Sequence, residues 1–143
     1  MHGIWRLVTV SVVAAIACAA AIVAFQDRTA IKALGCGHGI VTQPGYVAAV
    51  QAQPNPPRAA GTDVLIDVRL GGQPLNGADV CMTTDMVGMP MGGPPNYKAR
   101  PSGPGRYDTF IAFGMAGTWA GEVVVSSGGK PVLAQPVSFS VSP

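Results

Sequence analysis

Apolar and polar residues alternate along much of the chain. The clearest run spans residues 62–70, where one face carries Val64, Ile66, Val68 and Leu70. Because successive side chains of a strand point to opposite faces, this alternation predicts a β-strand with one buried face. Similar runs predict further strands over residues 46–51, 78–82, 105–113, 117–126 and 132–141. In the last runs the expected inward residues include Trp119, Phe139 and Val141.

Glycine and proline separate these runs. The chain has 19 glycines and 13 prolines, and both residue types are costly inside helices, so the body of the protein is not expected to be helical. Gly71-Gly72 and Gly128-Gly129 are typical of turns, and Pro136 indicates an edge strand or a bulge. We therefore predict an all-β domain, an antiparallel sandwich of six or seven strands, with a small barrel as the alternative.

The N-terminal segment has a different pattern. Residues 7–26 carry no charged side chain and are almost all apolar. As a helix, this stretch would span roughly 30 Å, the thickness of a bilayer's hydrocarbon core. We predict one N-terminal transmembrane helix; a cleaved signal peptide, or a lipoprotein signal ending at Cys18, is the alternative. Positive charges flank both ends, at Arg6 and at Arg28 and Lys32, so they do not determine the orientation.

Three segments follow from these patterns: an anchor or signal peptide over residues 1–26, a connector with a candidate first strand over residues 27–60, and the β-sandwich over residues 61–143. Charged residues make up 11% of the chain and the net charge is +2. Without a basic stripe, this charge does not indicate nucleic-acid binding.

The chain has three cysteines. Cys18 lies in the apolar segment, whereas Cys36 and Cys81 lie in the part expected to be exported. Exported cysteine pairs usually form disulfides, and closing so long a loop would stabilise the fold by about 4 kcal/mol. The alternative is that these thiolates bind a metal ion together with His38 or Met82.

A loop rich in methionine is expected over residues 85–95, between two strands. Met86, Met89 and Met91 form the pattern M-x-x-M-x-M among glycines and prolines. Apolar side chains in such a loop need a partner, which could be the core, another protein or a soft metal ion. Thioethers suit Cu(I), and Met115 is expected at the same end of the sandwich as a fourth ligand. Cys81 and Met82 are additional candidate ligands.

Catalysis is not expected. The aspartates are spread over strand edges and turns, and no nucleophile motif is present. His38 is the only histidine outside the N-terminal tip, so one chain cannot build a site of several imidazoles. Trp119 is expected in the core, and Tyr107, near the start of a strand, is expected to be structural.

Three motifs in combination resemble the YtkA-like domain: Met89-Pro90-Met91-Gly92, Pro104-Gly105-Arg106-Tyr107 and Met115-Ala116-Gly117-Thr118-Trp119. The resemblance covers about residues 60–142. It implies an immunoglobulin-like β-sandwich outside the cytoplasm, often attached to or fused with envelope transport proteins. A copper role is often inferred for the Met-rich members. The pair Cys36 and Cys81 is not part of the family pattern, and the tethered, stand-alone architecture differs from the fused members.

Together these features predict a domain tethered to the cell membrane by a single pass, on its extracytoplasmic side, that binds or delivers Cu(I) through the Met-rich loop. The alternative is a non-catalytic accessory subunit of a larger envelope or respiratory membrane complex. In that case the loop docks onto an integral membrane partner, and the alanines of the helix allow close packing against partner helices. A third hypothesis is a structural domain without a ligand.

Overall fold

The computed structural model describes residues 36, 42–89 and 95–143. This part of the chain forms the strands β1 Tyr46–Gln53, β2 Thr62–Leu70, β3 Gln73–Pro74, β4 Asp79–Met86, β5 Asn96–Lys98, β6 Arg100–Gly103, β7 Arg106–Ile111, β8 Gly117–Ser127 and β9 Lys130–Val141. Within these ranges, no helix is long and apolar enough to cross a membrane. The predicted anchor, residues 1–26, lies outside the described residues.

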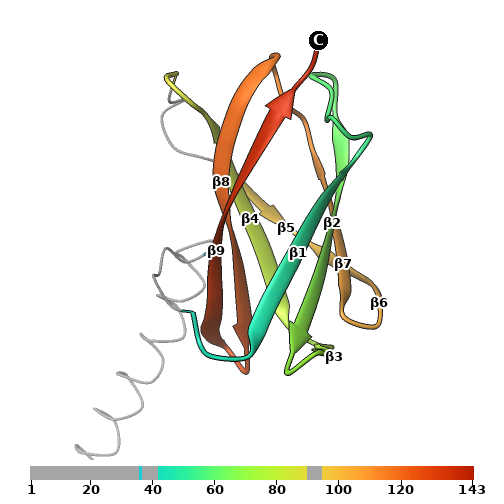
Figure 1. Cartoon of the computed structure of the whole chain (residues 1–143), viewed down its shortest axis with the longest axis vertical. Helices are drawn as coiled ribbons and strands as arrows, with labels where there is room; N and C mark the ends of the chain where they lie inside the picture. Colours follow the sequence, from blue (N-terminus) through green and yellow to red (C-terminus); the bar gives the residue numbers. More distant parts are fainter. Residues whose placement is uncertain (1–35, 37–41, 90–94) are drawn as a thin grey trace, which may run out of the picture. The chain divides into compact units, whose positions relative to one another are not determined.

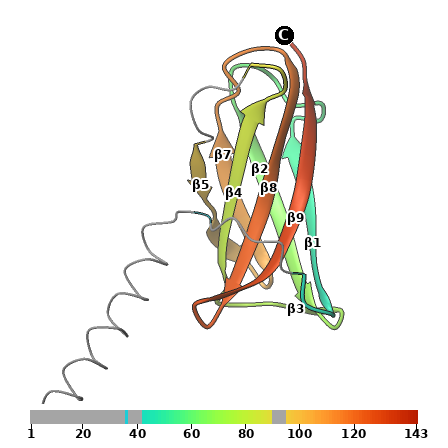
Figure 2. The ribbon, with the colours of Figure 1, turned by 90° about the vertical axis from the view of Figure 1, so that its left-hand side faces the viewer.

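The strands form two antiparallel sheets that pack face to face (Figures 1 and 2). One sheet has the order β1-β2-β7-β6, with β3 paired to the end of β2. The other has the order β5-β4-β8-β9, which makes β9 an edge strand, as Pro136 indicated. The predicted antiparallel sandwich is confirmed, but the described residues form nine strands where six or seven were predicted, because short strands such as β3, β5 and β6 are added by pairing.

The core lies between the sheets and follows the predicted alternation. It is built from inward-facing residues of both sheets, the most completely buried being Tyr107, Phe113, Ile66, Met82, Ile111, Val64, Val68, Val80, Val123 and Val125. Phe113 packs edge-on against Trp119, with ring centroids 5.3 Å apart, and against Phe139 at 5.6 Å. Trp119 is 6% exposed and therefore belongs to the core, as expected.

Tyr107 closes the core near the start of β4. Its hydroxyl donates a hydrogen bond to the carbonyl oxygen of Leu75 at 2.8 Å and accepts one from the backbone N–H of Ala78 at 3.0 Å. A buried hydroxyl needs hydrogen-bond partners, and this one finds both in the segment between β3 and β4. The two bonds therefore connect β7 to that segment. Tyr107 is a structural residue, as the sequence indicated.

Two short strands lie where the sequence predicts only loop. β5 pairs with β4 through Cys81 and Lys98, and β6 pairs with β7 through Arg100 and Asp108. The four residues of β6 are all exposed, so no alternation of buried and exposed positions marks this strand in the sequence. These strands are defined by pairing, and they occupy part of the connection, residues 83–104, that the predicted strands 78–82 and 105–113 leave between them.

Two other strands extend beyond their predicted limits. β4 continues to Met86, because Thr83 and Thr84 are buried although they are polar. β1 pairs with β2 along its whole length, so residues 46–53 are part of the sandwich and the predicted connector contributes its first strand.

Cys36 and Cys81 form the disulfide that the sequence predicts, with their Cα atoms 5.2 Å apart. Cys36 is 2% exposed, although it precedes the first strand by ten residues. The backbone N–H of Gln43 also donates to the carbonyl oxygen of Val132 at 2.9 Å. The segment ahead of β1 is thus attached to both β4 and β9.

Candidate metal site at one end of the sandwich

The end of β4 and the start of β8 meet at the end of the sandwich that also carries the C-terminus (Figures 1 and 2). Beyond the last strand pair, the backbone N–H of Val87 donates to the carbonyl oxygen of Thr118 at 3.0 Å. The N–H of Met89 then donates to the carbonyl oxygen of Met86 at 3.2 Å, which closes a turn. The first bond holds the beginning of the Met-rich loop against β8, and the second fixes the turn that follows β4.

Met86 is the last residue of β4 and is paired with Trp119 across the sheet. Its side chain is partly buried and packs against the core. A Cβ placed on Gly117 would lie 2.8 Å from Met86 Cε, so the glycine leaves the room that the thioether occupies. Gly117 also has a backbone φ of +144°, a value that residues other than glycine rarely adopt. The local backbone of β8 therefore accommodates Met86.

Met115 approaches the same end from the connection between β7 and β8, two residues before Gly117. Its carbonyl oxygen accepts a hydrogen bond from Nε1 of Trp119 at 3.1 Å. Its side chain is 41% exposed. The backbone of Met115 is thus fixed while the residue as a whole remains exposed.

Met89 and its neighbour Val87 are the most exposed of these apolar side chains, at 52% and 58%. Together with Met115 they place three exposed apolar residues at this end of the sandwich. Backbone pairing brings Met115, from a separate segment, to the same end as Met86 and Met89. The fourth predicted ligand, Met91, lies outside the described residues.

Comparison with known proteins agrees with the resemblance seen in the sequence. The family model described as YtkA-like matches residues 42–124, more than half of the 143 residues. The chain belongs to the YtkA-like family. The match begins before β1 and ends within β8, so it includes the Met-rich loop and Met115.

Other comparisons add little about this YtkA-like protein. The Lin-41 filamin domain, a solved structure, is similar with a TM-score of 0.47 and 15% sequence identity, over 66% of this chain and 91% of that one. No curated protein matches.

The two additional candidate ligands lie elsewhere in the YtkA-like sandwich. Cys81 is bonded to Cys36, and a disulfide sulfur has no thiolate to offer. Met82 is fully buried in the core, where it pairs with Val123 and Tyr97. The described residues also hold no group of three or more His, Cys, Asp or Glu side chains placed to bind a metal. The sulfur atoms at the exposed end, among the described residues, are the thioethers of Met86, Met89 and Met115.

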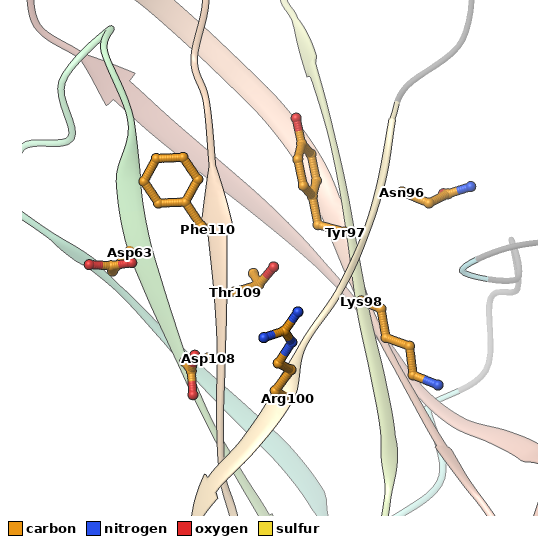
Figure 3. Close-up of a pocket in the computed structure, with 8 residues that line it drawn as sticks. All are labelled: Asp63, Asn96, Tyr97, Lys98, Arg100, Asp108, Thr109 and Phe110. Atoms are coloured by element: carbon orange, nitrogen blue, oxygen red, sulfur yellow. The ribbon is translucent and has the colours of Figure 1, made fainter.

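A cavity of about 400 Å³ lies along β7, lined by Asp63, Asn96, Tyr97, Lys98, Arg100, Asp108, Thr109 and Phe110. Figure 3 shows the rings of Phe110 and Tyr97 on its two sides, with the guanidinium of Arg100 between them and below. Two cations and two carboxylates balance each other in the lining, and it contains no sulfur. This cavity could not be predicted from the sequence, because its lining residues come from four strands, β2, β5, β6 and β7.

Proposed function

We propose that the YtkA-like domain binds Cu(I) through Met86, Met89 and Met115, with Met91 as a fourth ligand, and holds it for transfer to a partner. The observation that carries this proposal is the position of three methionines, from two separate segments, at one end of the sandwich with two of them exposed. Met82, in contrast, is fully buried as a core methionine should be. Exposed thioethers gathered at one place suit a soft monovalent ion.

The proposal also includes the location of the domain in the cell. We place the domain outside the cytoplasm, anchored in the cell membrane by residues 1–26, and assign it no catalytic activity. The disulfide between Cys36 and Cys81 supports this location, because disulfides persist in oxidising compartments. Protease added to intact cells with a permeabilised outer barrier should degrade the domain. A domain that is protected until the membrane is dissolved would contradict the extracytoplasmic location.

Competition for Cu(I) with a coloured chelator tests the binding proposal on the full-length chain in detergent. We expect one Cu(I) per chain. The single substitutions Met86→Leu, Met89→Leu and Met115→Leu should each weaken Cu(I) affinity at least about tenfold. Loss of a residue that only supports a metal ligand already costs about that much affinity, and loss of a ligand should cost no less. Met82→Leu is the matched control, because it removes a buried sulfur and should leave binding unchanged. Absence of binding to the native chain, or equal binding by the variants, would refute the proposal.

Val87 supports a second candidate function, an accessory subunit that docks onto an integral membrane protein. Its side chain is 58% exposed beside the methionines and has no donor atom for a metal. Val87→Ser should weaken docking and leave copper binding intact. If the native protein co-purifies with integral membrane subunits, loses them on Val87→Ser and binds no Cu(I), the docking function stands and the copper function falls.

A further inference from the structure

We infer that Trp119 is a positioning residue of the copper site, which fixes Met115 through its indole N–H and flanks the ion through its ring. This inference rests on the proposed Cu(I) function and goes beyond it, because a tryptophan offers no ligand for the metal. The hydrogen bond from Nε1 of Trp119 to the carbonyl oxygen of Met115 measures 3.1 Å. It links a core side chain directly to the backbone of a proposed ligand.

The indole can act as a fixed donor because the core holds its ring. Trp119 is 6% exposed, and its ring meets Phe113 edge-on at an interplanar angle of 66°. Phe113 is itself fully buried and packs on Phe139. A ring held on several sides keeps one orientation, so the position of the Met115 carbonyl is set by the core. The backbone at Met115 in turn directs its exposed side chain.

Trp119 also lies beside the second proposed ligand. Met86 is its partner across β4 and β8, and directly opposed residues of antiparallel strands have Cβ atoms about 4.5–5.5 Å apart. One indole therefore contacts the backbone of Met115 and neighbours the side chain of Met86. A cation bound by both thioethers would lie close to the ring, and over its face the ring's quadrupole would attract the positive charge.

The first test removes the N–H and keeps an aromatic ring. Trp119→Phe in the full-length chain should weaken Cu(I) binding about tenfold. It removes the hydrogen bond from the indole N–H to the Met115 carbonyl oxygen, and the free energy of one such bond corresponds to about a tenfold change in affinity. Phe139→Leu is the matched control: it disturbs the same aromatic cluster without touching the Met115 carbonyl. If both variants lose stability but only Trp119→Phe loses affinity, the role is positioning. Equal affinity losses in both variants would overturn the inference.

A double-mutant cycle separates positioning from general stability. In a Met115→Leu background, Trp119→Phe should cause much less than a tenfold further loss of Cu(I) affinity, because the ligand that the indole N–H positions is already absent and an aromatic ring remains beside the ion. An undiminished tenfold loss in that background would show that Trp119 acts independently of Met115 and would overturn the inference.

A second measurement keeps Trp119 in place. The chain has two tryptophans, so Trp5→Phe leaves Trp119 as the only tryptophan, whose emission can be excited apart from that of the tyrosines. Stoichiometric Cu(I) or Ag(I) should change the emission of Trp119, and the change should vanish when Met86 and Met115 are both leucine. Metal binding that depends on the methionines but leaves the emission constant would refute the role of Trp119 alone. Absence of any metal binding would refute the proposed function together with this inference.

Discussion

Met86 and Trp119 are cross-strand partners at the point where β4 ends and the exposed methionines begin. This pairing joins the aromatic end of the core to the Met-rich loop. The bond between the Val87 N–H and the Thr118 carbonyl oxygen extends the contact by one residue beyond the strand pair. The position of the loop therefore depends on the β4–β8 pairing, and changes in this pairing should change both stability and copper binding.

Gly117 provides the room for Met86, so Gly117→Ala should destabilise the fold and weaken Cu(I) binding. The strained φ is expected to cost about 1–3 kcal/mol, and the new methyl group would displace the Met86 thioether. Urea unfolding and chelator competition measure the two effects. Gly114→Ala is the control, because nothing lies within 4 Å of its added Cβ. Equal effects of the two substitutions would contradict this role of Gly117.

Gly121 allows β8 to approach β4 closely. Its added Cβ would collide with the backbone of Thr83 and lie 2.9 Å from Thr84 Cα. Because backbone cannot swing aside as a flexible side chain can, Gly121→Ala should cost about 3 kcal/mol in the free energy of unfolding. Gly103→Ala, whose nearest neighbours are side-chain atoms of Arg106 at 3.8 Å, should cost far less. Similar unfolding midpoints for the two variants would show that this approach of the strands is not tight.

The main strands could be predicted from the sequence because their burial follows a period of two. Val64, Ile66 and Val68 in β2 illustrate the rule, and all three are at most 1% exposed. β5 and β6 could not be predicted in this way, because they are three and four residues long, too short to show a period of two, and are defined by their pairing with β4 and β7. The extension of β4 could not be predicted because Thr83 and Thr84 are polar in sequence, although both are buried in the sandwich.

The candidate site was predicted in part. The pattern of Met86, Met89 and Met91 is visible in the sequence, and Met115 could be assigned to the same end because it lies between two predicted strands. The roles of Gly117 and of the Trp119 indole N–H could not be predicted, since each depends on a three-dimensional contact with a methionine. The cavity beside Phe110 likewise depends on how four strands are arranged.

Tyr107 offers a test of whether stability and copper binding are separate. Tyr107→Phe removes the partner of the Leu75 carbonyl oxygen and of the Ala78 N–H, which should cost about 1–3 kcal/mol. These groups lie next to the start of β4, whereas Met86 lies at its end, so Cu(I) affinity should not change. Urea unfolding and chelator competition on the same variant give the answer. A parallel loss of affinity would mean that the site senses global stability.

The disulfide should stabilise the sandwich substantially. It joins residues 45 positions apart, and replacing Cys36 and Cys81 by serine should lower the free energy of unfolding by about 4 kcal/mol. Cys18→Ser is the control and should have no effect on the domain. A thiol titration gives an independent check. The chain without substitutions, unfolded in denaturant, should show one free thiol before reduction and three after it. Three free thiols in the unreduced protein would contradict the bond.

X-ray absorption at the copper edge tests the central claim most directly, because it identifies the atoms bound to the metal. The full-length chain loaded with one Cu(I) should show a first shell of sulfur neighbours, and Met115→Leu should reduce their number. Since Cys36 and Cys81 are bonded to each other, these sulfurs should be thioethers. A first shell of oxygen and nitrogen alone, or a sulfur count unchanged by Met115→Leu, would contradict the assignment of the exposed methionines as the copper site.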